Sequence, residues 1–502
     1  MRKIFVTLYF TIILLTLPAQ TTNSLYFTSD WSGCHKSNAS FAPATGYFSL
    51  PLMGDNSVDI SSNLGLANLI YPFNSELVTF MHPSVNGEQF VSKLNKNNFL
   101  NEESNVSLFS CGFFNKKSGF WSIDISVKEE FDLNIPIDFF RLAKLGMTSN
   151  STYYNLANLS YDNTSIVEIA VGYSQDIDHE WRIGGKAKLL VGLYSTQIDY
   201  SQFDVNLTQN SWQAITKGDL QVNSNFEKYK TNAEGFLDFT DTHLDFTHIR
   251  PAGLGLALGT SNNAIDLPKI KPAGYGVSFD FGATYKPVAY YGLTISAGVK
   301  NFGLFNWQKR SLLRGIANGD IYFDGFQYVD IYNVDVDQQI DHLKKDAEGL
   351  VKFREVVDEN EYHTYELPWS CSLSAEYNLE SKLNSDVSVG ILIDRKTFRR
   401  SAFYDIVGAL IYRPWSWLSS TITYSGYSTG AKGVGIALNL SPKWINFFVA
   451  SDCITTKLNR QLIPYNAFHI NVEFGLSMPL WKNEKDRRHL TEDQRLYPYQ
   501  QR

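Results

Sequence analysis

Residues 468–480 alternate strictly between apolar side chains and polar or small ones. One face carries Phe468, Ile470, Val472, Phe474, Leu476, Met478 and Leu480. In a chain that is 44 % hydrophobic, seven apolar residues in seven alternate positions would arise by chance in roughly 0.3 % of such windows. The segment is longer than the usual strand of about 5 or 6 residues, and ~9 to 11 residues cross a bilayer at a tilt. This pattern predicts a membrane-spanning strand with lipid on one side.

The same alternation recurs along most of the chain. Further strands are predicted at residues 58–66, 106–114, 121–128, 167–174, 181–193, 277–285, 293–299, 367–377, 387–393, 404–412, 418–427, 434–440 and 444–452. The connections alternate between short ones, such as 115–119 and 178–180, and long ones, such as 67–105 and 302–366. Short periplasmic turns and long external loops are typical of outer-membrane barrels. The sequence therefore predicts an all-β, transmembrane antiparallel barrel of about 14 strands.

The long connections carry short helical patterns. These lie at Ser84 to Asn95, Pro136 to Leu145 and Asp337 to Val357. We expect these segments to cap the mouth of the barrel or to fold into it as a hatch. The connection at 194–274 is long enough to contain another hairpin, or strands that extend above the membrane.

The two ends of the chain differ from the barrel pattern. Arg2 and Lys3 precede an apolar run that ends before Pro18-Ala19, which predicts a signal peptide at residues 1–19 and export to the cell outer membrane. The alternative is an N-terminal anchor, although the run is shorter than the ~20 residues of a spanning helix. Residues 20–481 form the predicted barrel with its N-terminal segment and loops. Residues 482–502 are charged, lack apolar periodicity and are predicted to be a disordered periplasmic tail.

Composition supports the barrel and excludes some partners. Aromatic residues make up 14 % of the chain and charged residues only 19 %, against ~25 % charged residues in a typical soluble domain. Such a bias fits aromatic girdles at the two membrane interfaces. The net charge of -7 gives no basic surface for nucleic acid, so the expected partners are outer-membrane lipid and other envelope proteins. The four cysteines have no metal-ligand spacing, and no metal or cofactor is predicted.

Several segments before residue 194 resemble a known family. They are Tyr47-Phe-Ser-Leu-Pro-Leu-Met-Gly, Pro83-Ser-Val with Phe90-Val-Ser-Lys-Leu, Gly119-Phe-Trp-Ser-Ile-Asp-Ile-Ser, Glu168-Ile-Ala-Val-Gly-Tyr and Arg182-Ile-Gly-Gly-Lys-Ala-Lys-Leu-Leu-Val-Gly-Leu. The chain resembles an uncharacterised Bacteroidetes outer-membrane barrel family, grouped as a domain of unknown function. The resemblance implies a barrel similar in layout to the long-chain fatty acid transporters. It implies no activity and no functional residues.

Charged residues occur at positions that the alternation turns inward. The predicted lumen-lining residues are Asp124, Lys128, Glu168, Arg182, Lys186, Lys188, Asp280, His469 and Glu473. None has the spacing of a catalytic motif, and interior charges of a barrel usually pair across strands or line water. His469 and Glu473 share one face of one strand but lie ~13 Å apart, which rules out direct contact. No catalytic residue is predicted.

Three functions are compatible with this reading. The first is a pore or transporter for small substrates, apolar ones included. The second is a structural or accessory barrel that serves a secretion or surface-attachment complex and transports nothing. The third, an outer-membrane hydrolase, needs a Ser/His or Asp/His cluster at the outer rim, which the sequence does not assemble. We therefore expect a protein that is not an enzyme.

Overall fold

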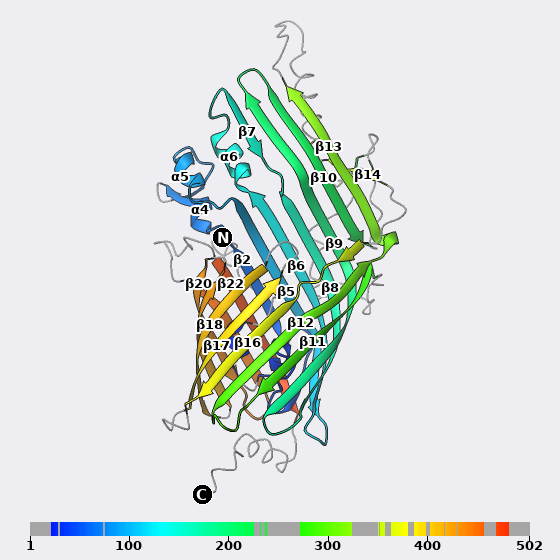
Figure 1. The fold of residues 1–502 in the computed structure, drawn as a ribbon, viewed down its shortest axis with the longest axis vertical. Coiled ribbons are helices and arrows are strands. Elements are labelled where there is room, and N and C mark those ends of the chain that lie inside the picture. Colours follow the sequence, from blue (N-terminus) through cyan, green and yellow to red (C-terminus); the bar gives the residue numbers. More distant parts are fainter. Residues whose placement is uncertain are drawn as a thin grey trace, which may run out of the picture.

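The chain folds as a closed barrel whose wall continues upward on one side as a sheet (Figure 1). The computed structural model describes residues 22–28, 31–73, 76–224, 231, 236–237, 272–323, 350, 352–356, 363–379, 386–397, 402–415, 417–428, 430–455 and 468–480. The predicted signal peptide and the predicted C-terminal tail lie outside these residues. No helix among the described residues is long and apolar enough to span a membrane.

Fourteen antiparallel strands make up the barrel, and the predicted fold class is confirmed. The first of them is interrupted and consists of β1 (Gly46–Ser49) and β2 (Asn56–Ser62). The others are β5 (Asn97–Phe114), β6 (Phe120–Pro136), β8 (Ser160–Asp176), β9 (Trp181–Thr208), β11 (Gly274–Tyr285), β12 (Leu293–Trp307), β16 (Ser370–Asn378), β17 (Val387–Thr397), β18 (Ala402–Trp415), β19 (Leu418–Tyr427), β20 (Lys432–Leu440), β21 (Asn446–Thr455) and β22 (Phe468–Leu480). The barrel closes because β2 pairs with β5 on one side and with β22 on the other.

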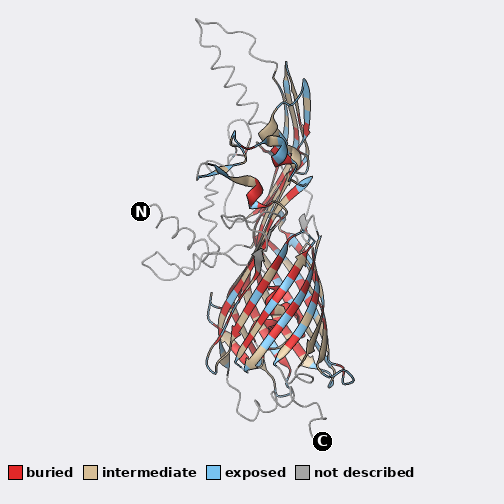
Figure 2. Cartoon of the chain, turned by 90° about the vertical axis from the view of Figure 1, so that its left-hand side faces the viewer, coloured by how far each residue is buried: buried red, intermediate tan, exposed pale blue. Residues whose placement is uncertain are grey.

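Alternation along each strand separates two environments, and Figure 2 shows the resulting bands of buried and exposed residues around the barrel. On β9, Ile183 and Leu189 are 47 % and 46 % exposed on the outer face, whereas Lys186 and Lys188 are buried. Aromatic pairs lie beside the short turns, among them Trp181 stacked on Tyr285 with ring centroids 4.5 Å apart. An apolar outer face with interfacial aromatic rings is the surface expected of a barrel in a lipid bilayer.

The upward extension begins with β9, which is long enough to pair with strands of the barrel and with strands of the extension. Its first half pairs with β8 and β11 in the barrel, and its second half pairs with β10 (Trp212–Ser224) and β7 (Ser151–Asn155). β10 in turn pairs with β13 (Leu312–Phe323), and β13 pairs with β14 (Arg354–Val356). The predicted connection at 194–274 thus contains strands above the membrane, as its length allowed.

Short elements pack beside the extension above the barrel. They are α4 (Leu66–Leu69), β3 (Ile70–Phe73), β4 (Glu76–Thr79), α5 (Gly87–Val91) and α6 (Ile137–Leu145), with η1 (Lys309–Ser311) and β15 (His363–Tyr365) on the opposite loops. Phe90 and Phe140 form the centre of the apolar cluster between α5 and α6. Two of the three predicted loop helices are therefore present, while most of the segment Asp337 to Val357 lies outside the described residues.

Loop helices do not fill the lumen; the N-terminal segment does. Residues 22–28 and 31–45, called the plug below, include α2 (Asn23–Tyr26) and α3 (Cys34–Ser37) and lie inside the barrel against inward-facing side chains. Of the two placements expected for the loop helices, folding into the lumen is not found for α5 and α6, which pack on each other above the barrel. Helices of four residues have no apolar periodicity to read in a sequence.

Candidate functional site

Buried charges from neighbouring strands pair across one side of the lumen. Lys188 of β9 lies 2.7 Å from a carboxylate oxygen of Asp280 and 3.6 Å from one of Glu168. Lys128 approaches Glu168 to 2.7 Å from the other side. These residues face each other because β6, β8, β9 and β11 are consecutive neighbours in the sheet. Each carboxylate therefore has a cation within contact distance, which offsets the cost of removing both from water.

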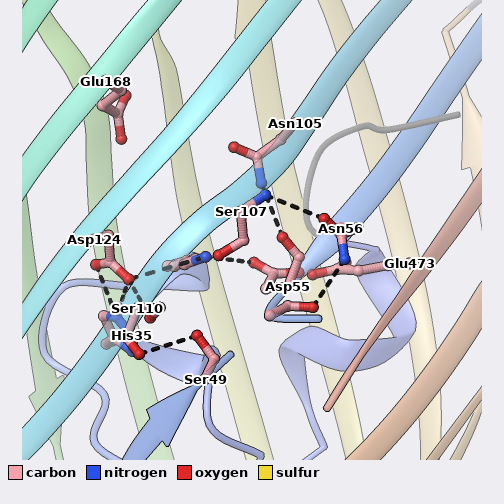
Figure 3. A network of polar contacts seen from close by, with 12 residues as sticks. His35, Ser49, Asp55, Asn56, Asn105, Ser107, Ser110, Asp124, Glu168 and Glu473 are labelled. Atoms are coloured by element: carbon pink, nitrogen blue, oxygen red, sulfur yellow. Dashed lines mark hydrogen bonds and ion pairs between the residues drawn. The ribbon is translucent and has the colours of Figure 1, made fainter. Parts of the chain in front are cut away.

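The plug contacts a second buried carboxylate of the same polar cavity, Asp124 (Figure 3). His35 Nε2 lies 3.1 Å from Asp124, and Lys186 lies 3.5 Å from the same carboxylate. Ser110 donates a hydrogen bond of 2.6 Å to it. Burial lowers the pKa of His35 to about 4, with the nearby Lys186 acting in the same direction and Asp124 opposing it. His35 is therefore a neutral donor at neutral pH, and the lysines supply the positive charge.

A second polar cluster lies on the side of the lumen where the barrel closes. Asp59 of β2 is 3.2 Å from Nε2 of His469 and 3.7 Å from the ammonium of Lys396. Lys396 also lies 3.7 Å from Asp405. The ring of His469 stacks on Tyr427 with centroids 4.1 Å apart. This packing fixes the imidazole between a carboxylate and an aromatic face.

Apolar side chains of the plug occupy the opposite part of the lumen. Trp31 is fully buried against Phe448 of β21, with ring centroids 4.7 Å apart. Phe27 packs on inward-facing apolar residues of β17 and β18, namely Leu392, Val407, Ala409 and Ile411. A Cβ at Gly390 would lie 2.6 Å from the Phe27 ring, so this strand position needs glycine for the ring to approach.

Hydrogen bonds from the wall hold the plug backbone. Arg413 donates to the carbonyl of Phe27 at 2.8 Å and also contacts Glu376 at 2.8 Å. Arg182 donates to the carbonyl of Ser40 at 2.8 Å, near the end of the barrel that carries the short turns. Because most of these donors are charged, each bond is stronger than a neutral one.

The structure thus places the sequence-predicted residues in several groups. Lys128, Glu168, Lys188 and Asp280 form one chain of ion pairs, and Lys186 pairs separately with Asp124. All six residues line the same polar cavity. Arg182 is half-buried and binds Asp176 and the plug. His469 belongs to the Asp59 cluster, and Glu473 accepts a plug N–H, so these two residues have separate partners.

Sequence reasoning missed the residues that complete these groups. They are His35, Lys36, Asp55, Asp59, Lys396, Asp405 and Asp452. The available signal was charge at inward positions of predicted strands, which Asp405 satisfies, whereas Lys396 lies beyond the strand predicted at 387–393. For His35 and Lys36 no such signal exists, because they precede the first strand.

The ladder between β12 and its neighbour is interrupted. β12 pairs with β16 over Leu293 to Lys300 and with β15 from Phe305 onward, so residues 301–304 have no ladder partner on this side. Asn301 adopts a positive φ of 60°, donates its N–H to Asp280 and accepts a hydrogen bond from Lys188. The charged network therefore fixes the bulge at which the strand leaves its partner.

A cavity of about 360 Å³ lies at this interruption in the wall. Most of its lining is apolar and comes from Phe302, Leu304, Tyr365, Leu367, Pro368 and Trp369. Phe302 and Leu304 are 64 % and 68 % exposed, which places them on the outer surface. Asn301 lines this cavity and also a polar cavity of about 70 Å³ inside the lumen. The two spaces, one apolar and one polar, meet at this residue.

No group of His, Cys, Asp and Glu residues able to hold a metal ion occurs in the described part of the chain. Cys34 is buried in the apolar cluster of Trp31 and Phe448 and forms no disulfide bond there, and neither do Cys111 and Cys371 on the barrel wall.

Comparison with known proteins identifies a family but no activity. Residues 39–452 match a family described as a family of unknown function, DUF5723. No curated protein matches the chain. Among solved structures, it is similar to a TodX deltaS2S3 mutant, a monoaromatic hydrocarbon channel, with 10 % identity, a TM-score of 0.39 and coverage of 93 % of this chain and 96 % of that one. A Pseudomonas aeruginosa FadL homologue gives 9 % identity, a TM-score of 0.37 and coverage of 92 % and 99 %.

Proposed function

Because the chain belongs to this family of unknown function, DUF5723, membership names no activity, and we propose from the geometry that the protein carries small apolar molecules across the outer membrane. The observation behind the proposal is the apolar cavity at the break between β12 and β16. An ordinary barrel wall is a continuous ladder, which leaves no space between adjacent strands. A break lined by apolar side chains favours a molecule that partitions into lipid.

The size and lining of the cavity fit such a molecule. About 360 Å³ lies within the range of ~300 to 1,000 Å³ found for small-molecule sites. Burial of apolar surface contributes about 25 cal/mol per Å². The lumen beside the cavity is lined by paired charges, where an apolar molecule gains nothing from burial. The wall cavity is therefore the favourable position for the substrate.

A route also needs the plug to move. Asn301 separates the wall cavity from the polar cavity, and Lys36 of the plug lines the latter. In the structure the plug lies across the lumen, so we assign it the closed state of the transporter. Movement of the plug would open the space beneath the wall cavity.

Filling the wall cavity tests the proposal. We expect Leu367→Trp to slow uptake of the lipophilic dye N-phenyl-1-naphthylamine by cells that express the protein. The matched control is Leu410→Trp, because Leu410 is 49 % exposed on the outer face of β18 and does not line the cavity. Folding of both variants is checked by heat-modifiable mobility in gels. Equal uptake by the two variants, or no uptake above that of cells without the protein, would contradict the proposed function.

The upward extension favours a second candidate, an accessory barrel that docks an envelope protein. Tyr153, Trp212 and Tyr322 are 59 %, 55 % and 65 % exposed on it. Isolation in mild detergent tests this role, since a docked partner should co-elute with the wild type and be lost from a Trp212→Ala, Tyr322→Ala double variant. If the barrel elutes alone in both cases and cells that express it take up the dye, the accessory role is excluded and transport remains.

A further inference from the structure

Two buried carboxylates in the lumen receive the start of the plug. Glu473 of β22 and Asp452 of β21 are both fully buried. Glu473 accepts the backbone N–H of Thr22, and Asp452 accepts those of Asn23 and Ser24, the latter at 3.1 Å. Figure 3 shows Glu473 beside Asp55 at this place. The first residues of the plug are thus held by carboxylates and by no other charged group.

The charges here do not balance among the described residues. No Lys, Arg or His nitrogen of the described chain forms an ion pair with Glu473 or Asp452. Lys36, the nearest ammonium in the plug, lies 3.0 Å from Asp55 and 3.9 Å from Asp124. The carboxyl groups of Glu473 and Asp55 adjoin each other, and Glu473 Oε1 and Asp55 Oδ1 are buried without an N–H or hydroxyl donor from the described residues. A buried carboxylate oxygen without a partner is costly, so the site calls for one more cationic donor.

The chain can supply that donor itself. Cleavage after Ala19, the site that the sequence predicts, makes Gln20 the first residue. Its nitrogen then lies two residues before that of Thr22, and two residues span at most ~7 Å. The new α-amino group is therefore separated by only two residues from the Thr22 N–H that Glu473 accepts.

We propose that Glu473 and Asp452 form a binding site for the α-ammonium group that signal-peptide removal creates, and that this ion pair holds the plug in the lumen. Hydrolysis adds the OH of water to the carbonyl carbon of Ala19 and its hydrogen to the nitrogen of Gln20. At neutral pH the amine takes up a proton and the new carboxyl group loses one. The uncleaved chain has an uncharged amide nitrogen at this position. Plug docking is thereby coupled to processing during export.

The proposal first requires a free amine at the right residue. Intact-mass and N-terminal sequencing of the protein isolated from outer membranes should give a chain that starts at Gln20 with an unblocked amine. A start outside residues 20–22, or a first residue cyclised to pyroglutamate, would overturn the proposal.

The second test measures whether the amine is held. Only the neutral amine reacts with an N-hydroxysuccinimide acetate ester, and carboxylates within ~4 to 6 Å raise an amine pKa by about 1 unit or more above its ordinary ~7.7 to 8.0. At a pH near 8, we expect the α-amine of the folded wild type to be acetylated at least about fourfold more slowly than that of Glu473→Gln. Glu76→Gln, at an exposed position of β4, is the control and should behave as the wild type. Equal rates in the folded wild type and Glu473→Gln refute the ion pair.

A third variant separates the ion pair from a proton shared between Glu473 and Asp55. Three glycine or serine residues inserted after Ala19 move the amine away and leave both carboxylates unchanged. We expect this extension to make the thiol of Cys34 in the plug more reactive, and to add nothing to the effect of Glu473→Gln, because both remove one interaction. A shared proton predicts no effect of the extension, and that result overturns the proposal. None of these measurements depends on transport, so a failure here is distinct from a failure of the proposed function.

Discussion

Replacement of Trp31 by alanine should release the plug and leave the barrel intact. Trp31 is fully buried between plug and wall, where it meets Phe448 and Ala437. A Cβ at Gly33 would lie 2.1 Å from its ring, so the chain folds closely around it. Truncation of a buried Trp to Ala typically costs about 3 to 5 kcal/mol. No strand pairing of the barrel involves Trp31, so the cost falls on docking of the plug.

The thiol of Cys34 reports docking directly, because it lies in the same apolar cluster and is 5 % exposed. The assay uses a parent in which Cys111, Cys371 and Cys453 are replaced by alanine, folded in detergent and treated with a water-soluble maleimide. Reaction through an undocked state follows the population of that state. Since each 1.4 kcal/mol is a factor of ten, we expect labelling of Trp31→Ala to be roughly 140-fold to 4,000-fold faster.

Trp444→Ala is the matched control, because this indole is 71 % exposed outside the lumen. It removes the same side chain from a place that the plug does not touch, so labelling of Cys34 should stay at the parental rate. If Trp31→Ala folds and its thiol reacts no faster than that of the parent, the plug is not held by this packing. In that case the polar contacts between plug and wall would be sufficient to keep the Cys34 thiol buried.

Three further results are expected for the plug. The hydroxyls of Ser40 and Thr284 are 2.8 Å apart, so an oxidised Ser40→Cys, Thr284→Cys pair should stop dye uptake, and a reductant should restore it. A Cβ at Gly184 would lie 1.9 Å from a plug carbonyl oxygen, so Gly184→Val should form the barrel yet expose the plug thiol to maleimide. His35 has a pKa of about 4 when docked and about 6.5 when free, so the free form binds more protons between these values and docking should weaken, by about 3 kcal/mol at most, as pH falls from 6.5 to 4. Susceptibility of the plug to pepsin at each pH measures this, and His35→Asn should abolish the dependence.

The strands could be predicted from the sequence because their information is local. On β18, Ile406 and Leu410 alternate with Asp405, and this two-residue period specifies a strand with a lipid face wherever it lies in the chain. Fourteen such segments with alternating short and long connections are sufficient to predict a closed barrel. The start of β16 at Ser370, three residues later than predicted, marks a place where the ladder beside β12 is broken.

The site could not be predicted in the same way because its contacts join distant residues. His35 and Asp124 are 89 positions apart, and Thr22 and Glu473 are 451 apart. Nothing in the pattern around His35 names a partner. The wall cavity could not be predicted either, because it results from the absence of pairing between part of β12 and β16. The sequence of one strand does not determine its register against a strand that is distant in the chain.

One signal in the sequence did point to a plug. Val407, Ala409 and Ile411 are apolar at inward positions, where a water-filled lumen would select polar residues. Apolar side chains on the inner face are removed from water only if another apolar group packs on them inside the lumen, and Phe27 does so. Where the plug packs, the inner wall therefore has apolar residues on β17, β18, β20 and β21 and paired charges on β6, β8, β9 and β11. The pair Lys396 and Asp405 lies farther along β17 and β18, beyond these apolar residues. The plug is divided in the same way, since Phe27 and Trp31 precede His35 and Lys36. Rotation of the plug within the barrel would move His35 and Lys36 from the carboxylate of Asp124 toward these apolar residues, so the matching patterns favour the seated position.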